Sequence, residues 1–244
     1  SLGKAVVITV HGRSPRPSGM RGLVHRLVEL CCIRVADQIA FVANSLRDEI
    51  GGSGVVIPVG VDVSAFQSLS TQREEVRREL AVTQRFLVLY VGRVTKDKGI
   101  PVLLEAFASV NLRKGRTLCL ALVGPVSEDM EGILTSGLGP LQGDVFVLGF
   151  RTDIARFLAA ADLFVLPSLR EGLPMSLLEA MAAGVPVVAS AVGDIPLLLR
   201  EGELGVLVPP GDSEALAAAI IRVAENPKEA THVARQAVQV MTGS

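Results

Sequence analysis

The strongest constraint on the fold is the alternation of short apolar runs with helix-length segments from Phe86 onward. Runs that are apolar along their whole length are typical of strands buried on both faces of a parallel sheet, and the segments between them are long enough for crossover helices. We therefore predict βαβ units. The predicted strands lie at about residues 86–91, 117–123, 145–148, 163–166, 185–189 and 204–208.

The N-terminal part of the chain repeats this pattern on a smaller scale. Its predicted elements are strands at about 5–10, 38–43 and 55–59 and helices at about 20–35 and 44–50. A sheet of so few strands would have open edges, and open edges favour aggregation. We therefore expect further strands upstream in a longer protein. The chain also starts without a Met and reaches its first strand after four residues, which again suggests a fragment.

A domain boundary is predicted near residue 62. The segment IPVGVD at 57–62 is followed by a polar stretch and then by a predicted helix at about 71–81. We therefore expect an α/β protein in two parts. Residues 1–62 would form part of a Rossmann-like domain, and residues 63–244 would form a complete doubly wound domain with a parallel sheet.

Composition excludes several classes of protein. Hydrophobic residues are 49% and charged residues 20%, which is typical of a globular domain. The net charge of −1 gives no global field to attract nucleic acid, so we expect no such partner. Three cysteines, two of them adjacent, indicate a reduced, cytoplasmic setting. No apolar stretch approaches the roughly 20 residues that span a bilayer.

Two cations flank the turn after the predicted strand 86–91. Gly92 and Arg93 follow the strand, and Lys98 precedes the next helix. Ligands of doubly wound sheets bind beyond the carboxyl ends of the strands. Arg offers a fork of donors and Lys a compact charge, so the pair could clamp a diphosphate. A solvated basic loop, to which Lys96 would also belong, explains the same spacing.

Two glutamates follow the predicted strand 163–166. Glu171 lies in the loop before a helix, Pro174 suits the first turn of that helix, and Glu179 falls in its second turn. A helix N-terminus is a natural phosphate site, and carboxylates beside it could accept hydrogen bonds from sugar or ribose hydroxyls. Alternatively, Glu171 only complements the helix dipole and Glu179 faces solvent.

These motifs resemble the donor-binding domain of glycosyltransferase family 4, which has the GT-B fold. The resemblance rests on LYVGR at 89–93 with Lys98-Gly99, and on the run EGLPMSLLEAMAAGVPVVAS from Glu171, which contains the family's two glutamates separated by seven residues. IPVGVD is similar to the interdomain junction, and VPPGD at 208–212 is similar to a late turn, so the similarity covers nearly the whole chain.

The resemblance implies retaining transfer of a sugar from an NDP-sugar to an acceptor hydroxyl. Arg93 and Lys98 would hold the diphosphate, Glu179 the ribose and Glu171 the transferred sugar, while His11 would face that sugar from the acceptor side. No cofactor is expected, because the NDP-sugar is a substrate, and no metal either, since no His, Cys or Asp cluster has ligand spacing. The predicted catalytic residues are Glu171 and His11, and the predicted donor-binding residues are Gly92, Arg93, Lys98, Gly172, Leu173 and Glu179.

Several alternatives stay open from the sequence. A nucleotide-sugar epimerase of GT-B fold and a non-catalytic nucleotide-binding module fit the same motifs. The acceptor could be a saccharide, a lipid or a small molecule. Four arginines within residues 13–26 favour either contact with the cytoplasmic membrane surface or a solvated helix face. Leu197 stands where the family often has Glu, and a chain without the family's first strands and last helix could bind nucleotide yet be inactive.

Overall fold

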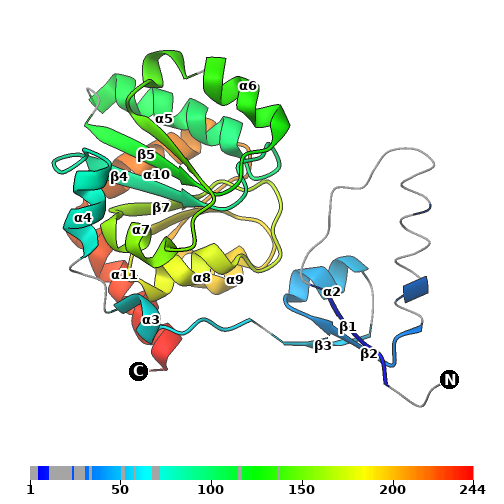
Figure 1. The fold of residues 1–244 in the computed structure, drawn as a ribbon. Helices are drawn as coiled ribbons and strands as arrows, with labels where there is room; N and C mark the ends of the chain where they lie inside the picture. Colours follow the sequence, from blue (N-terminus) through cyan, green and yellow to red (C-terminus); the bar gives the residue numbers. More distant parts are fainter. Residues whose placement is uncertain are drawn as a thin grey trace. The chain divides into compact units, whose positions relative to one another are not determined.

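The computed structural model describes residues 5–10, 24, 31–32, 35–50, 53–57, 59–67, 72–114, 117–136 and 138–243. By its contacts the chain divides into two compact units (Figure 1). The first comprises Ser1–Val59 and Glu171–Leu173, and the second comprises Gly60–Arg170 and Pro174–Ser244. The sequence predicted one boundary near residue 62 and did not anticipate that three residues from the second half would group with the first unit.

The larger unit is built on a six-stranded parallel sheet with the order β6-β5-β4-β7-β8-β9. Counted along the chain from β4, this order is 3-2-1-4-5-6, which is the doubly wound arrangement. The predicted α/β class is thus confirmed. The strands are β4 (Phe86–Val91), β5 (Leu118–Val123), β6 (Val145–Gly149), β7 (Leu163–Leu166), β8 (Val187–Ser190) and β9 (Val206–Val208).

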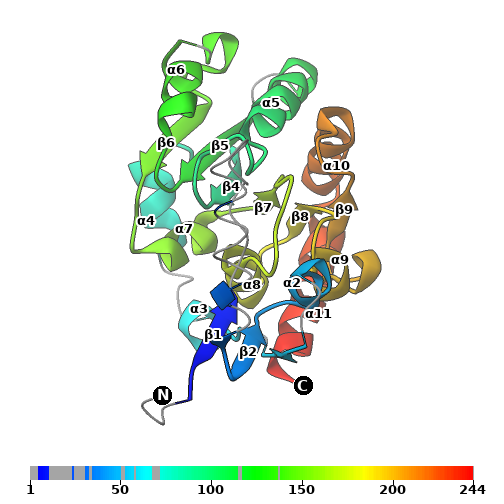
Figure 2. The ribbon, with the colours of Figure 1, turned by 90° about the vertical axis from the view of Figure 1, so that its right-hand side faces the viewer.

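Helices cover both faces of this sheet. Figures 1 and 2 show α5, α6 and α10 on one face and α4, α7, α8 and α11 on the other. Strands β5, β7 and β8 are buried at every position between these layers, which explains why their sequences are apolar throughout. The helices are α3 (Ser64–Gln67), α4 (Gln72–Glu79), α5 (Ile100–Lys114), α6 (Glu128–Ser136), α7 (Ile154–Ala160), α8 (Met175–Ala182), α9 (Ile195–Leu198), α10 (Ser213–Glu225) and α11 (Pro227–Thr242), with 3-10 turns η1 (Gly139–Leu141) and η2 (Arg200–Gly202).

Two arginines of α4 bind to the segment between α7 and β7, next to β4. Arg73 Nη1 donates to the carbonyl groups of residues 159–161 at 3.2, 2.9 and 3.0 Å, where the end of α7 would otherwise leave acceptors unpaired. Arg77 Nη1 donates to Asp162 Oδ2 at 2.9 Å. The same carboxylate oxygen accepts the Leu87 N–H at 2.7 Å. Asp162 therefore connects the start of β7 with β4 and with α4.

The smaller unit contains a three-stranded parallel sheet in the order β1-β2-β3. Its described elements are β1 (Val7–Val10), β2 (Gln38–Phe41), α2 (Asn44–Ile50) and β3 (Val55–Val56). Phe41 and Leu46 are the centre of its apolar cluster, and Leu173 packs against that cluster. The helix predicted at about 20–35 lies largely outside the described residues.

Candidate functional site

The candidate site lies where β4 and β7 run side by side in the larger unit. These strands pair in parallel through Val88 with Leu163 and Leu89 with Phe164. They are the first and fourth strands of the doubly wound order, so their connections leave toward opposite faces of the sheet. A ligand crevice forms beyond the carboxyl ends of the strands at such a point.

The loops that follow β4 and β7 are in direct contact. The Leu169 N–H donates to the Asp97 carbonyl at 3.1 Å. Gly99 has a φ of 71°, and a Cβ atom there would lie only 1.9 Å from the Pro167 carbonyl oxygen. Only glycine accommodates this approach. The loop that contains Lys98 therefore packs against the loop that leads to α8.

The turns that follow β4 and β5 also approach each other closely, and Gly92 belongs to the first of these turns. A Cβ atom on Gly124 would lie 1.9 Å from the Gly92 carbonyl oxygen, so the two backbones meet without room for a side chain. The Tyr90 hydroxyl is buried beneath this turn and donates to the Arg93 carbonyl at 2.7 Å. The backbone that presents the first cation is thus fixed by packing and by a hydrogen bond.

Arg93 presents its guanidinium group to solvent at this edge. Its side chain is 62% exposed, and Nη2 lies 3.8 Å from Asp97 Oδ2. An exposed ion pair at this distance contributes little, so a phosphate oxygen could replace Asp97 as the partner of Arg93. Lys98 is half-buried in the same loop. The two predicted cations therefore lie on the same loop between β4 and α5, and their joint contact with a diphosphate stays a prediction.

Helix α8 begins at Met175, and Pro174 is the residue that precedes it, with ψ of 118°. The prediction that Pro174 lies in the first turn was wrong by one position, because its extended backbone makes it the N-cap. Its carbonyl accepts the N–H groups of Leu177 and Leu178 at 3.2 and 3.4 Å. The N–H groups before them have no acceptor inside the helix, which gives this end its affinity for anions.

Glu179 is half-buried in the second turn of α8. Burial raises the pKa of its carboxyl group above the usual value of 4.5. A half-buried carboxylate gains free energy from hydrogen-bond donors, and ribose hydroxyls are such donors. The alternative that Glu179 simply faces solvent does not fit this burial. Its role toward ribose stays a prediction.

Glu171, Gly172 and Leu173 lie between β7 and α8 and group with the first unit. Within that unit, a Cβ atom on Gly172 would lie 2.8 Å from Leu46 Cδ1, so a larger residue there would require the Leu46 side chain to move. Arg93, Lys98 and Glu179 all belong to the second unit. The approach of Glu171, Gly172 and Leu173 to a bound donor stays a prediction. His11 lies outside the described residues, and its predicted role is likewise untested.

Thr95, which lies between Arg93 and Lys98 in the chain, was not among the predicted site residues. This residue is 9% exposed, and among the described residues its hydroxyl oxygen has no hydrogen-bond partner. Buried hydroxyls without a partner are uncommon in native proteins. A loop threonine is usually exposed and hydrogen-bonded to solvent, so no pattern in the sequence could have marked this one.

The loop after β6 carries an ion cluster that was not predicted from the sequence. Arg151 donates from Nε and Nη2 to the two carboxylate oxygens of Asp153, each at 2.9 Å, and Arg156 Nη1 donates to Asp153 at 2.9 Å. These bonds, chiefly the one from Arg151, lower the pKa of Asp153 to about 2. The cluster fixes the loop beside Phe150, whose side chain is 73% exposed after the carboxyl end of β6.

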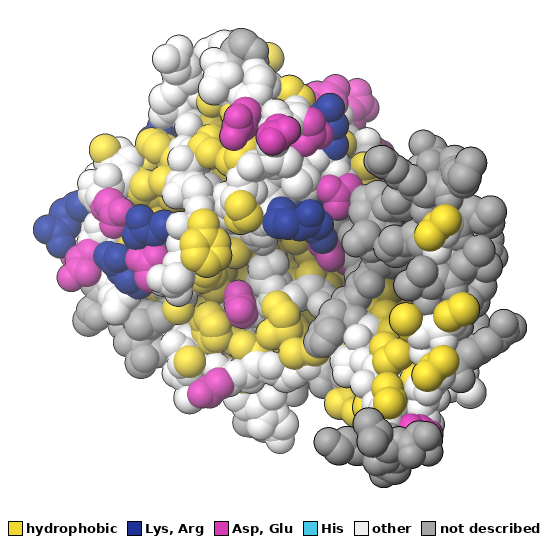
Figure 3. Space-filling model, turned by 45° about the vertical axis from the view of Figure 1, so that its right-hand side comes forward, with side chains coloured by type: hydrophobic (Ala, Val, Ile, Leu, Met, Phe, Trp, Pro, Cys, Tyr) yellow, Lys and Arg dark blue, Asp and Glu magenta, His cyan; other side chains and the backbone are white. Residues whose placement is uncertain are grey.

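Charges of both signs alternate on the face drawn in Figure 3, where Lys and Arg side chains lie beside Asp and Glu side chains. An anionic ligand would therefore be held by a local site instead of a broad positive field. Within the described ranges, no three His, Cys, Asp or Glu side chains are grouped so as to hold a metal ion. None of the described helices has the length and apolar character needed to cross a bilayer.

A sequence model of the family described as glycosyl transferases group 1 matches residues 85–226. The chain belongs to this family. The matched segment runs from the start of β4 to the end of α10, so it contains both cations and Glu179. The resemblance to a GT-B glycosyltransferase is confirmed.

Two curated glycosyltransferases illustrate how this group 1 chain relates to longer proteins. The alpha-D-kanosaminyltransferase of Streptomyces kanamyceticus is 32% identical over 255 residues, which covers 97% of this chain and 65% of that protein. The amylovoran biosynthesis glycosyltransferase AmsK of Erwinia amylovora is 37% identical over 155 residues, which covers 59% of this chain and 37% of that protein. The chain thus spans less than two thirds of each relative.

A solved structure shares the fold of this group 1 chain. The crystal structure of Anabaena HepE in complex with UDP-glucose matches with a TM-score of 0.87 and 26% identity. The match covers 98% of this chain and 68% of HepE. A protein of the same fold therefore binds a nucleotide sugar.

Proposed function

We propose that the protein to which this chain belongs transfers a sugar from a nucleoside-diphosphate sugar to a hydroxyl group of an acceptor. The contact between the Lys98 loop and the loop that leads to α8 carries the proposal. It supports a pocket in which Arg93, Lys98 and the N-terminus of α8 act on the same pyrophosphate. Fixed cations and helix N–H groups stabilise charge that develops on a leaving group.

The proposed reaction needs such a pocket at the leaving group. The bond between the anomeric carbon and the diphosphate oxygen breaks, a bond to the acceptor oxygen forms, and the acceptor hydroxyl loses its proton. Negative charge grows on the departing diphosphate, where Arg93 and Lys98 would neutralise it. Glu171 and His11 would orient the sugar, and retention with attack on the same face is the stereochemical course we propose for this family.

A diphosphate bound at this pocket would bring the ribose and the base of the donor close to further residues. Glu179 would accept hydrogen bonds from ribose hydroxyls, and the turns after β5 and β6, near Gly124 and Phe150, would contact the base. HepE binds UDP-glucose, so a uridine nucleotide is the first donor to test. A saccharide, a lipid or a small molecule would be the acceptor. We propose a cytoplasmic location, with a lipid acceptor bringing the protein to the membrane surface.

Two experiments test this function. Calorimetric titration of the 244-residue chain with UDP-glucose, GDP-mannose and ADP-glucose should show saturable binding of one nucleotide series. In the full-length protein, the preferred donor should release its nucleoside diphosphate only when an acceptor is present. Formation of a new sugar nucleotide without acceptor would instead indicate an epimerase, and binding without turnover in the full-length protein would indicate a non-catalytic module.

A further inference from the structure

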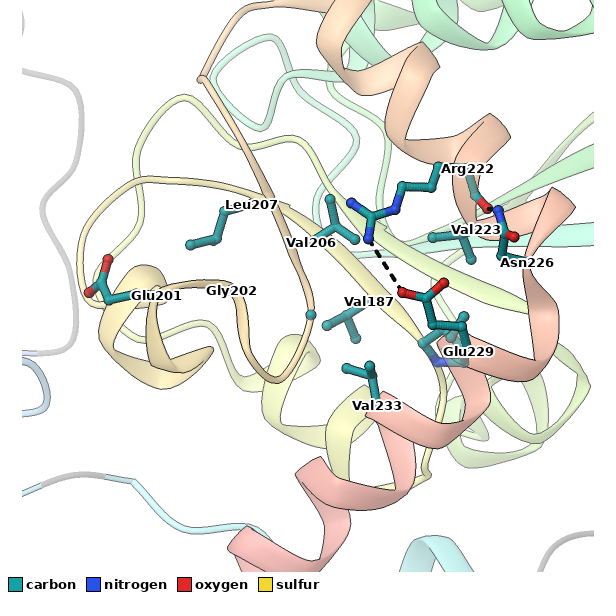
Figure 4. A pocket seen from close by; sticks show the side chains of 13 residues that line it. Val187, Glu201, Gly202, Val206, Leu207, Arg222, Val223, Asn226, Glu229 and Val233 are labelled. Atoms are coloured by element: carbon teal, nitrogen blue, oxygen red, sulfur yellow. Dashed lines mark hydrogen bonds and ion pairs between the residues drawn. The ribbon is translucent and has the colours of Figure 1, made fainter.

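A cavity of about 290 Å³ lies at the ends of the strands opposite to the candidate donor site. This cavity is open to solvent on one side, and it is lined by the amino ends of β8 and β9, the end of α10, the start of α11 and η2 (Figure 4). The donor site lies beyond the carboxyl ends, and none of its predicted residues lines this cavity. The function proposed above does not use this cavity.

The larger part of the cavity wall is apolar. Valine side chains come from two strands and two helices, and valine has a strongly restricted χ1 angle, so the shape of this wall is largely set before any ligand binds. A preformed apolar cavity with a few polar groups at its edge is the usual form of a small-molecule site. The valines are Val187, Val206, Val223 and Val233.

The mouth of the cavity has hydrogen-bond donors on the Arg222 guanidinium group and hydrogen-bond acceptors on Glu229 and Asn226. Figure 4 shows Arg222 extending from α10 toward Glu229 of α11. Arg222 Nη2 lies 3.5 Å from Glu229 Oε1, and the two side chains are 65% and 62% exposed, so the pair is weak. Asn226 Nδ2 donates to the Arg222 carbonyl at 2.9 Å, which leaves the Asn226 side-chain oxygen to accept.

The wall opposite α11 is strained. Arg200 and Glu201 have φ angles of 47° and 56°, which residues with a Cβ atom rarely adopt, and Glu201 and Gly202 line the cavity. Such conformations persist only where the surroundings impose them, and they cluster at ligand clamps. A Cβ atom on Gly205 would lie 2.4 Å from Val187 Cγ2, so this wall is also pressed against β8.

We propose that this cavity binds a small uncharged amphiphile whose apolar body lies against the valines and whose polar group both accepts from Arg222 and donates to Glu229. A carboxamide has this pattern. A carboxylate ligand would pair with Arg222 but lie beside the Glu229 carboxylate, and an ammonium ligand would meet the opposite conflict. An uncharged group with one donor and one acceptor leaves both charges of the mouth satisfied. The inference is independent of sugar transfer.

Amide-resolved NMR of the 244-residue chain tests this site with three ligands of equal chain length. Hexanamide should cause saturable shifts of the Gly202 and Gly205 amide signals. Hexanoate and hexylamine should bind about two- to fivefold more weakly, because each brings its charge beside the like charge of Glu229 or Arg222, and both of these side chains are exposed. Absence of saturable shifts with hexanamide would overturn the proposal, and equal binding of the charged ligands would overturn the assigned ligand class.

Substitutions in and near the cavity test whether hexanamide binds there. Val233→Phe fills the cavity from α11 and should weaken hexanamide binding at least about tenfold. Val240→Phe is the matched control, because Val240 lies on the same helix, is 38% exposed and does not line the cavity. Arg222→Met removes the donor fork at an exposed position without disturbing the core, and it should weaken binding as well. Unchanged affinity in both Val233→Phe and Arg222→Met would contradict the site.

Discussion

Gly99 approaches Pro167 so closely that a Cβ atom on Gly99 would lie 1.9 Å from the Pro167 carbonyl oxygen. This contact joins the loops after the two central strands of the doubly wound sheet. It places the loop that carries Lys98 against the loop that leads to α8. The geometry of the candidate diphosphate pocket therefore depends on backbone packing as much as on charge.

Gly99→Ala should destabilise the chain and weaken nucleotide binding. Alanine at a φ of 71° is strained, and its methyl group would collide with the Pro167 backbone, so we expect a loss of about 1–3 kcal/mol in the free energy of unfolding. Urea denaturation measures this loss. Gly132→Ala in α6 is the control, because a Cβ atom there meets nothing within 4 Å, and it should be neutral or stabilising. Equal effects of the two variants would contradict the packing argument.

Asp162→Ala should be strongly destabilising. The substitution leaves Arg73, Arg77 and the Leu87 N–H without their shared acceptor, and breaking a largely buried ion pair costs about 3–5 kcal/mol. Chemical denaturation gives the value. Asp48→Ala provides a comparison, because Asp48 is 69% exposed beside Arg47, and it should change stability by no more than about 0.5 kcal/mol.

Asp153 should make the stability of the chain depend on pH in acid. Its pKa is about 2 in the folded chain against an ordinary value of 3.8, so it contributes stability above its ordinary pKa, and this contribution is lost as pH falls from about 4 to 2. Asp153→Asn should therefore show a shallower loss of unfolding free energy over this interval. Thermal unfolding at stepped pH measures it, and parallel curves for the two proteins would argue against the ion cluster.

Glu179→Gln should separate stability from binding. Burial raises the pKa of Glu179, so its ionised form opposes folding above that pKa, and the free variant at neutral pH should be as stable as the wild type or more so. Nucleotide affinity should nevertheless fall about tenfold or more, because a charged acceptor for ribose is lost. Glu105→Gln, at an exposed position of α5, should change neither quantity. Unchanged affinity in Glu179→Gln would reject the ribose contact.

The fold was largely predictable from the sequence, because a strand that is buried on both faces of a sheet is apolar along its whole length. The strands predicted at 86–91 and 163–166 have the same bounds in the structure. The strand expected at 185–189 instead spans Val187–Ser190, because the helix α8 ends at Ala182, residues 183–184 form a turn, and residues 185–186 connect this turn to the strand. Apolar composition marks a buried segment but not the residue at which pairing starts.

The site was only partly predictable. Arg93 and Lys98 follow a predicted strand, and Glu171 and Glu179 lie on either side of a predicted helix start, so local sequence was enough to mark these four residues. The close approaches of Gly99 to Pro167 and of Gly124 to Gly92 depend on residues far apart in the chain, as does the burial of Thr95. The grouping of Glu171–Leu173 with the N-terminal unit likewise arises from tertiary contacts, which no spacing in the sequence encodes.

Calorimetric titration of the 244-residue chain with UDP-glucose, or with whichever nucleotide sugar the chain binds best, measures whether Arg93 binds the diphosphate. Lys96→Ala is the matched control, because Lys96 lies in the same loop, is 58% exposed and pairs with Asp129 at 3.6 Å. Arg93→Ala should lower affinity by about tenfold or more, since hydrogen bonds to charged groups contribute about 1.5–3 kcal/mol, while Lys96→Ala should bind like the wild type. Equal affinities of Arg93→Ala and the wild type would show that Arg93 does not bind the diphosphate.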